Sequence, residues 1–186
     1  MSSKKELRAE MKAKLSKISD EAHHQLSLLV SNNLIKFLND LGVFQKKLII
    51  GVFSPIEKEP DWFVMMVEGK EKIETAYPAI ADDKMVFKLA RMDELLANHD
   101  FGVNILSPQV EAKLVTPDIV IVPGLGFSAT GKRLGRGKGF YDRYLEKSSV
   151  VKIGIAFEMQ ITEDIPVDEH DVLMDFVVTD KSLYKK

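Results

Sequence analysis

The sequence predicts an α/β fold built around a parallel sheet. Apolar residues follow a helical period before residue 40, and short apolar runs typical of strands follow residue 47. The segments DIVIVP at 118–123 and VVKIGIAF at 150–157 enclose a glycine-rich loop and a helical segment, a β-loop-α-β unit that favours parallel pairing. With 186 residues, the chain is long enough for one domain with a core of two or three layers, so we treat 1–186 as a single unit.

Two helices are expected before the first strand. The first runs from Ser3 to about Leu15 and has one narrow apolar stripe at a spacing of four residues. The second begins with Asp20 as its N-cap and continues towards Leu38. Its apolar face consists of Leu26, Leu29, Val30, Leu34 and Leu38.

The rest of the chain mixes strands and helices. We expect strands over 48–53, 72–80 and 84–90, with a helix over 60–69 between the first two. Residues 93–117 show no clear period. A strand over 175–179 is expected to close the chain.

Composition excludes several classes of protein. A net charge of −2 argues against a broad nucleic-acid surface, and the absence of cysteine excludes disulfides and thiolate catalysis. The apolar runs are too short to cross a membrane and the first residues do not resemble a signal peptide, so we expect a cytoplasmic protein without a membrane segment. No histidine has a partner at a metal-ligand spacing, and we expect all of them on the surface: His23, His24, His99 and His170.

The most informative segment is the loop from Val122 to Leu145. Its glycines allow backbone N–H groups to approach an anion closely, and its lysines and arginines supply positive charge. A helix from about Gly139 to Leu145 would direct its positive end at the same anion. Asp142, inside the first turn, is a plausible magnesium ligand beside bound phosphate oxygens. The alternative interpretation is a surface loop with a solvated run of basic residues.

Part of this loop is similar to the phosphate-binding loop of nucleoside triphosphatases. The segment GFSATGKR at 126–133 fits the pattern G-x4-G-K-[ST] except at its last position. Arg133 stands there in place of the Ser or Thr hydroxyl that would bind magnesium. We therefore reject that interpretation.

The segment RLGRGKGFYD at 133–142 resembles the signature of the 5-formyltetrahydrofolate cyclo-ligases, also called 5,10-methenyltetrahydrofolate synthetases. The likeness begins at Pro123 and departs from the family pattern at Ser128, where Asp is usual. The segment FGVNILSP at 101–108 resembles a second family element but has Ser107 in place of Glu. Chain length and the terminal segments are also similar, so the resemblance covers essentially the whole sequence.

The resemblance implies roles for particular residues. Arg136, Lys138 and Tyr141 would act in catalysis, and Asp142 and Asp171 would hold magnesium, with Asp175 as a second acidic residue after the latter. The residues implied in ATP binding are Lys4, Arg8, Arg133, Leu134, Gly135, Arg136, Gly137, Lys138, Gly139, Phe140 and Tyr141. Without the resemblance, Lys4 and Arg8 would be interpreted as a solvated helical face.

The folate site is implied by FSPIEKEPDW at 53–62, which resembles a conserved turn of the family. Phe53 would pack on the pterin ring, Glu57 would accept its hydrogen bonds, and Arg136 would also reach the folate. Lys58 and Pro60 depart from the pattern, so Glu59 is an alternative to Glu57. The competing interpretation is that these carboxylates only cap the helix that follows.

The resemblance thus implies an enzyme that uses ATP and Mg²⁺ to convert 5-formyltetrahydrofolate to 5,10-methenyltetrahydrofolate through a phosphorylated formyl group, releasing ADP and phosphate. It implies a three-layer α/β sandwich with a mostly parallel, Rossmann-like sheet, shared with sugar-phosphate isomerases and CoA transferases. We expect a monomer. Two alternatives remain open. One is a phosphosugar isomerase that needs no ATP; the other is a folate- or nucleotide-binding module whose departures at Ser128 and Ser107 have removed turnover.

Overall fold

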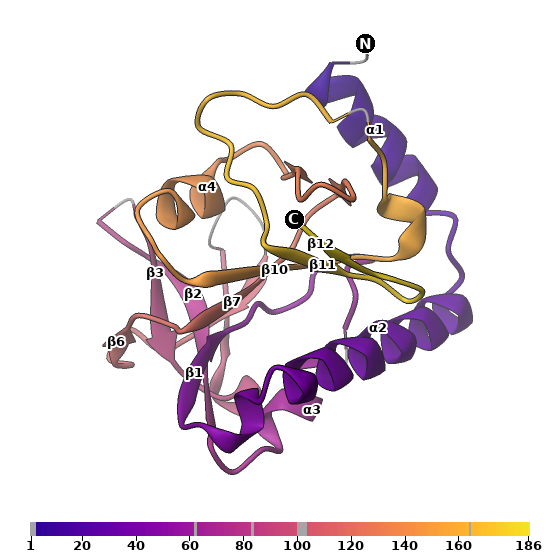
Figure 1. Ribbon diagram of the computed structural model, residues 1–186. Helices are drawn as coiled ribbons and strands as arrows, with labels where there is room; N and C mark the ends of the chain where they lie inside the picture. Colours follow the sequence, from indigo (N-terminus) through magenta and orange to yellow (C-terminus); the bar gives the residue numbers. More distant parts are fainter. Residues whose placement is uncertain (1–2, 62, 83, 100–103, 164) are drawn as a thin grey trace.

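The structure, a computed structural model, describes residues 3–61, 63–82, 84–99, 104–163 and 165–186 (Figure 1). Its centre is an eight-stranded sheet in the order β12-β11-β10-β7-β1-β2-β3-β6. The bounds are β1 Leu48–Gly51, β2 Ile73–Ala81, β3 Lys84–Leu89, β6 Leu114–Val115, β7 Ile119–Val122, β10 Val151–Ile155, β11 Phe176–Val178 and β12 Leu183–Lys185. The five strands from β11 to β2 are parallel, and β12, β3 and β6 run antiparallel to their neighbours. The predicted α/β class and the parallel β-loop-α-β unit are confirmed.

Two capped helices begin the chain. In α1, Lys4–Leu15, the Ser3 hydroxyl accepts from the N–H of Glu6, whose carboxylate accepts in return from the N–H of Ser3. Helix α2, Asp20–Asp40, has Ser19 as its N-cap, and the hydroxyl of Ser19 accepts from Ala22 N at 3.2 Å. The prediction of Asp20 as the N-cap is therefore wrong by one residue, because either side chain can accept such a bond and the sequence does not fix which one does.

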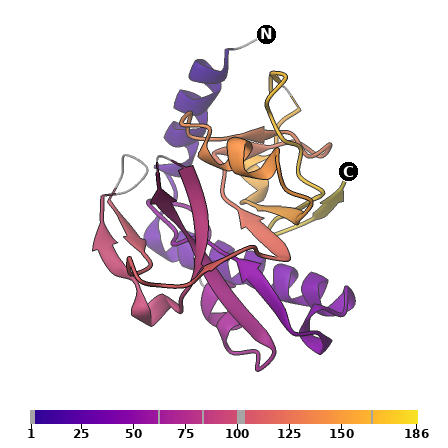
Figure 2. The ribbon, with the colours of Figure 1, turned by 90° about the vertical axis from the view of Figure 1, so that its left-hand side faces the viewer.

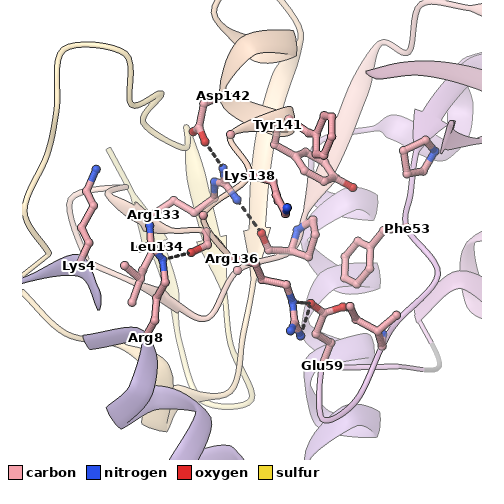
Figure 3. A pocket seen from close by; sticks show the side chains of 18 of the residues that line it. Lys4, Arg8, Phe53, Glu59, Arg133, Leu134, Arg136, Lys138, Tyr141 and Asp142 are labelled. Atoms are coloured by element: carbon pink, nitrogen blue, oxygen red, sulfur yellow. Dashed lines mark hydrogen bonds and ion pairs between the residues drawn. The ribbon is translucent and has the colours of Figure 1, made fainter. Parts of the chain in front are cut away.

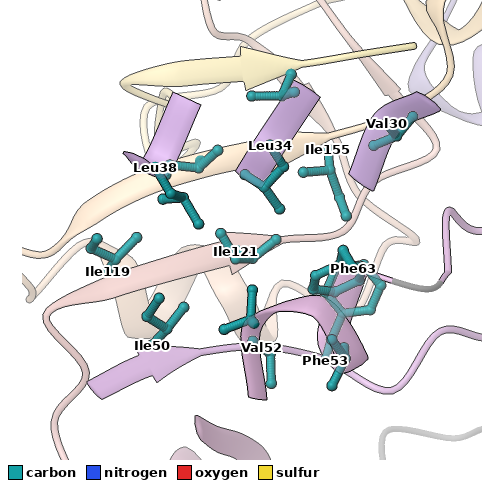
Figure 4. Close-up of a cluster of buried hydrophobic side chains, with 14 of the residues drawn as sticks. Val30, Leu34, Leu38, Ile50, Val52, Phe53, Phe63, Ile119, Ile121 and Ile155 are labelled. Atoms are coloured by element: carbon teal, nitrogen blue, oxygen red, sulfur yellow. The ribbon is translucent and has the colours of Figure 1, made fainter. Parts of the chain in front are cut away.

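Helices cover both faces of the sheet (Figures 1 and 2). On one face, α2 and the short α3, Phe63–Glu68, enclose an apolar core, and Figure 4 shows Val30, Leu34 and Leu38 of α2 directed at the isoleucines of the central strands. On the other face, α4, Phe140–Leu145, packs with Tyr144 against Phe87 of β3. Because the parallel strands are buried on both sides, β7 is a continuous apolar run with no polar alternation. Within the described part of the chain, no helix is both long and apolar enough to span a bilayer.

Several short strands were not predicted. β11 is not the last strand of the chain, because β12 follows it and pairs with it in antiparallel orientation. Residues 93–117, where no strand was expected, contain β6 and a hairpin made of β4, Leu96–Asn98, and β5, Ile105–Ser107. A further hairpin, β8 Gly126–Phe127 with β9 Arg133–Leu134, lies inside the glycine-rich loop. Pieces of two or three residues are too short to show a period of two, so the sequence carries no signal for them.

The core around β10 predicts a specific sensitivity to added volume. A Cβ at Gly154 would lie 2.5 Å from Cε1 of Phe127, which is fully buried. We expect Gly154→Ala to lower the free energy of unfolding by about 1–3 kcal/mol, measured by urea denaturation. In the Phe127→Leu background the same substitution should cost less. An equal cost in both backgrounds would show that the ring is not the obstacle.

Candidate active site

A cavity of about 450 Å³ opens beyond the carboxyl ends of β1 and β7, where open parallel sheets place their ligands. Its walls come from α1, from the turn that follows β1, and from the loop that follows β7 (Figure 3). All the residues assigned by resemblance to ATP, folate or magnesium line it, namely Lys4, Arg8, Phe53, Glu57, residues 133–141, Asp142 and Asp171. The structure therefore brings segments more than 160 residues apart in the chain to one site.

Helix α1 supplies a row of cations. Its apolar side chains Leu7 and Met11 are buried, which leaves Lys4 and Arg8 facing the cavity. The Nε of Arg8 donates to the carbonyl oxygen of Gly135 at 2.9 Å, so the helix is attached to the glycine-rich loop. Lys12 also lines the cavity and was not predicted, although its spacing of four from Arg8 was a usable signal.

Lys4 joins α1 to the segment before β11. Its Nζ lies 2.6 Å from Oδ2 of Asp168 and 2.5 Å from Oδ2 of Asp171. Burial alone would lower the pKa of Lys4, but hydrogen bonds and charges of the two carboxylates outweigh burial and raise that pKa. The same hydrogen bond lowers the pKa of Asp168. Both carboxylates are thus attached to α1 in the cavity wall.

Arg133 forms the second ion pair of the site. Its side chain is only 6% exposed, Nη2 lies 2.7 Å from Oδ2 of Asp142, and Nη1 donates to the carbonyl oxygen of Pro123 at 3.1 Å. The helix that carries Asp142, Phe140–Leu145, nearly matches the predicted range, and with only six residues its dipole is small. Charged side chains and backbone N–H groups are therefore the main source of positive potential here.

Arg136 forms the third ion-paired group and connects two walls. Its Nε and Nη2 both lie 3.1 Å from Oε1 of Glu59, and its Nη1 lies 3.0 Å from Oε2 of Glu57. Glu59 is 5% exposed, and burial raises the pKa of its carboxyl although the charge of Arg136 opposes that rise. Burial would lower the pKa of Arg136, but the charge of Glu59 and the contacts with Glu57 raise it.

The two glutamates of the turn differ in what they can still bind. Glu59 uses both oxygens, because Oε2 accepts from Ile56 N at 3.1 Å while Oε1 accepts from Arg136. The side chain of Glu57 is 64% exposed and lines the cavity, and Glu57 itself adopts a left-handed backbone conformation, with φ of 52°. This geometry favours Glu57 over Glu59 as an acceptor for a ligand.

Aromatic residues line the wall opposite α1 (Figure 3). Phe53 is 2% exposed and packs on Phe63 with ring centroids 5.2 Å apart, so only a small part of its ring is open to a ligand. Burial raises the pKa of Tyr141, which keeps its phenol protonated. Among the described residues, the buried hydroxyl of Tyr141 has no hydrogen-bond partner, so it remains available as a donor or acceptor.

The carboxylates expected to hold magnesium lie in the cavity wall. No cluster of three or more acidic or histidine side chains suited to a metal occurs in the part of the chain that the structure describes. Mg²⁺ commonly takes only one or two carboxylates together with phosphate oxygens, and Asp142 and Asp171 each use one oxygen, Oδ2, for a neighbouring cation. The donor set therefore fits a magnesium ion that binds together with a nucleotide. Asp175 lies elsewhere, since its carboxylate accepts from Lys152 N at 2.8 Å.

The structure overturns one further prediction, for His23, and shows where Ser128 lies. His23 is not a surface residue, because its side chain is 13% exposed and its Nε2 lies 2.9 Å from the carbonyl oxygen of Glu59. Ser128 is fully buried, outside the residues that line the cavity, and its hydroxyl accepts from the N–H groups of Thr130 and Lys132 at 3.2 and 3.0 Å. Phe101 to Val103, from the second family element, lie outside the described residues.

Comparison with known proteins identifies the family. The profile of the 5-formyltetrahydrofolate cyclo-ligase family matches residues 1–180. The chain belongs to this family. A 5-formyltetrahydrofolate cyclo-ligase of Mus musculus is 32% identical over 197 aligned residues, covering 97% of this chain and 95% of the mouse protein. An Escherichia coli protein of the same name is 31% identical over 59% of this chain and 62% of its own length.

Solved structures agree with this assignment. The NMR structure of Aquifex aeolicus 5,10-methenyltetrahydrofolate synthetase superposes with a TM-score of 0.82 at 31% identity, covering 98% of this chain and 92% of that chain. A 5,10-methenyltetrahydrofolate synthetase from Mycoplasma pneumoniae gives a TM-score of 0.76 at 26% identity, with coverage of 96% and 99%. The mixed, mostly parallel sheet is thus shared with structures of this family.

The buried position of Ser128 predicts a structural role for its hydroxyl. We expect Ser128→Ala to lower the free energy of unfolding by roughly 1–3 kcal/mol, because two backbone N–H groups lose a buried hydroxyl as their acceptor. Ser149→Ala, at an exposed position, is the matched control and should change it little. Urea denaturation of both variants measures the difference. Equal stability of the two variants would contradict the assignment.

Proposed function

We propose that this cyclo-ligase uses ATP to convert 5-formyltetrahydrofolate to 5,10-methenyltetrahydrofolate, with release of ADP and phosphate. One observation carries the proposal: a single cavity has a cationic wall from α1 and the glycine-rich loop, and a wall of aromatic and carboxylate groups opposite (Figure 3). The first suits a triphosphate and the second suits a pterin. The kinship of the sheet with sugar-phosphate isomerases and CoA transferases, a monomeric state and the cytoplasmic location stay predictions.

The proposed chemistry needs no covalent enzyme intermediate. The formyl oxygen attacks the γ-phosphorus of ATP, so that an O–P bond forms while the bond to the ADP oxygen breaks. The N10 amine then attacks the activated formyl carbon, the C–O bond breaks, and phosphate leaves as the N10 proton is lost. Because the formamide is activated by phosphorylation, the protein has only to align the reactants and to neutralise charge.

The cationic wall would bind and align the phosphates. Lys4 and Arg8 from α1 and Lys138 from the loop converge on the cavity from different elements, which suits an anion with several oxygens. Arg133 is fixed by Asp142 and by a backbone carbonyl, so its guanidinium is oriented before a ligand arrives. The backbone of residues 134–140 lines the same cavity and would complete the cradle.

The opposite wall would hold the pterin. Glu57 has a carboxylate oxygen free of hydrogen bonds among the described residues and would accept from the amide and amino donors of the ring. Tyr141 and the exposed edge of Phe53 would contact the ring face. Arg136 would hold Glu57 in place, and it lies close enough to both walls to contact the folate as well.

Magnesium would bind at Asp142 and Asp171, the carboxylates that line the cavity beside the cations. When bound, the ion would neutralise phosphate oxygens of the nucleotide. The protein contribution is to place these two carboxylates at the cavity wall, where Lys4 and Arg133 orient them.

The first experiment is an absorbance assay for the methenyl-folate product. Purified protein is mixed with 5-formyltetrahydrofolate and Mg²⁺, with and without ATP. A rise in absorbance that requires ATP supports the proposal. No rise in absorbance, together with thermal stabilisation by both ligands, would favour a binding module. Neither a rise in absorbance nor thermal stabilisation by either ligand would favour the phosphosugar isomerase.

Lys138→Ala tests the cationic wall. Lys138 is exposed and its amine forms no ion pair with a described residue, so its removal leaves no buried partner unpaired. If it stabilises the transferring phosphoryl group, kcat should fall on the order of 10²- to 10³-fold without a change in melting temperature. Lys147→Ala, exposed and outside the cavity lining, is the matched control and should retain full activity. A near-normal kcat for Lys138→Ala would contradict a role of Lys138 in stabilising the phosphoryl group.

A further inference from the structure

Helix α2 carries a polar stripe that the sequence analysis did not recognise. Asp20, His23, Ser27 and Ser31 recur at intervals of three or four residues and so share one face of the helix. Ser27 and Ser31 are fully buried although their side chains are polar. None of the four residues lines the cavity.

The stripe contacts the turn that carries the two glutamates. Asp20 pairs with Lys58, with 2.5 Å between Oδ1 and Nζ. The Ser27 hydroxyl accepts from Asp61 N at 3.3 Å, and the Ser31 hydroxyl lies 3.1 Å from the carbonyl oxygen of Asp61. Together with the bond from His23 to Glu59, three of the four residues from 58 to 61 are held by the same helix.

His23 makes the contact closest to the active site. The carbonyl oxygen of Glu59 can only accept, so the proton must be on Nε2 of His23. The ring meets Phe157 edge-on with centroids 5.6 Å apart, which fixes the plane of the imidazole. Its Nδ1 is 3.8 Å from Oδ2 of Asp61, too far for a hydrogen bond.

The contact continues from the Glu59 backbone to the cavity. The residue whose carbonyl is held by His23 is the one whose carboxylate receives Nε and Nη2 of Arg136. Arg136 in turn holds Glu57. A shift of the peptide at Glu59 would therefore move the carboxylate that anchors Arg136, and with it the acceptor proposed for the pterin.

We infer that His23 is a positioning residue for the folate half of the active site. Its Nε2–H fixes the peptide of Glu59, so that Glu59 and Arg136 meet between the turn and the glycine-rich loop. The effect on catalysis rests on the function proposed above, whereas the effect on Arg136 does not. The imidazole acts through Glu59 and touches no substrate.

The test compares variants that keep or remove the donor. In His23→Gln, the side-chain amide can still donate to the carbonyl of Glu59, whereas His23→Leu retains bulk without a donor. Gln25→Leu, an exposed position on the same helix, is the matched control. For His23→Leu we expect the KM for 5-formyltetrahydrofolate to rise by roughly 3- to 10-fold, as the loss of one hydrogen bond allows, with the KM for ATP nearly unchanged. His23→Gln should restore most of the affinity.

A second readout does not depend on turnover. The Nε–H of Arg136 gives a ¹⁵N–¹H signal, assigned by its loss in Arg136→Lys, and the contact with Glu59 should protect it from solvent exchange. We expect exchange of this signal to accelerate in His23→Leu and to stay slow in His23→Gln and Gln25→Leu. If wild-type protein fails to form methenyl-folate but this pattern holds, the proposed function fails and the positioning role stands.

Two outcomes would overturn the inference. One is an unchanged Arg136 signal in His23→Leu; the other is equal loss of protection in His23→Leu and His23→Gln, which would assign the effect to ring packing. If His23→Leu does not fold, His23→Asn replaces it, because its shorter amide cannot reach the position of Nε2. Slow exchange in His23→Asn would then count against the inference, and fast exchange would support it.

Discussion

The buried ion pair of Arg136 and Glu59 is the interaction on which the site depends. A carboxylate that is 5% exposed is costly to leave unpaired, and Arg136 compensates it with two donors on one edge of its guanidinium while a third reaches Glu57. The pair joins the loop after β7 to the turn after β1, elements about 80 residues apart in sequence. Because removal of Arg136 would leave Glu59 without its cation, such a variant would lose stability as well as ligand contacts. A lysine at this position could not form both contacts in the same geometry.

Ion pairs between a cation and a carboxylate occur at three places in the cavity wall. Lys4 pairs with Asp171, Arg133 with Asp142, and Arg136 with Glu59, so each of these three cations already has a carboxylate partner in the described structure. A triphosphate that enters such a site must compete with these carboxylates for the cations. The carboxylates displaced from Lys4 and Arg133 would then be available to a divalent cation, which is consistent with a nucleotide that binds together with magnesium. Preformed pairs also keep the long side chains ordered, which reduces the entropy lost on binding.

Some elements of the fold and the site could be predicted from the sequence, and others could not. The β-loop-α-β unit and the basic loop follow from local composition and period, which depend on contiguous residues. By contrast, β12 and the strands β4 to β6 are two or three residues long, and tertiary pairing alone defines them. The role of His23 was invisible, because a polar residue on a helix indicates solvent unless its partner 36 residues later is known. The choice between Glu57 and Glu59 likewise required their burial, since both carboxylates stand in the same turn.

The departures from the family pattern affect the fold more directly than the site. Ser128 and Ser107 are 0% and 2% exposed, and neither lines the cavity. In the turn between β8 and β9, the Ser128 hydroxyl accepts from Thr130 N and Lys132 N, and a short carboxylate can accept equivalent bonds in such turns. Serine can thus replace aspartate there without removing a ligand contact. Because the binding-module alternative rested on these two positions, their burial away from the cavity weakens it, while the residues that do line the cavity retain the family signature from Arg133 to Asp142.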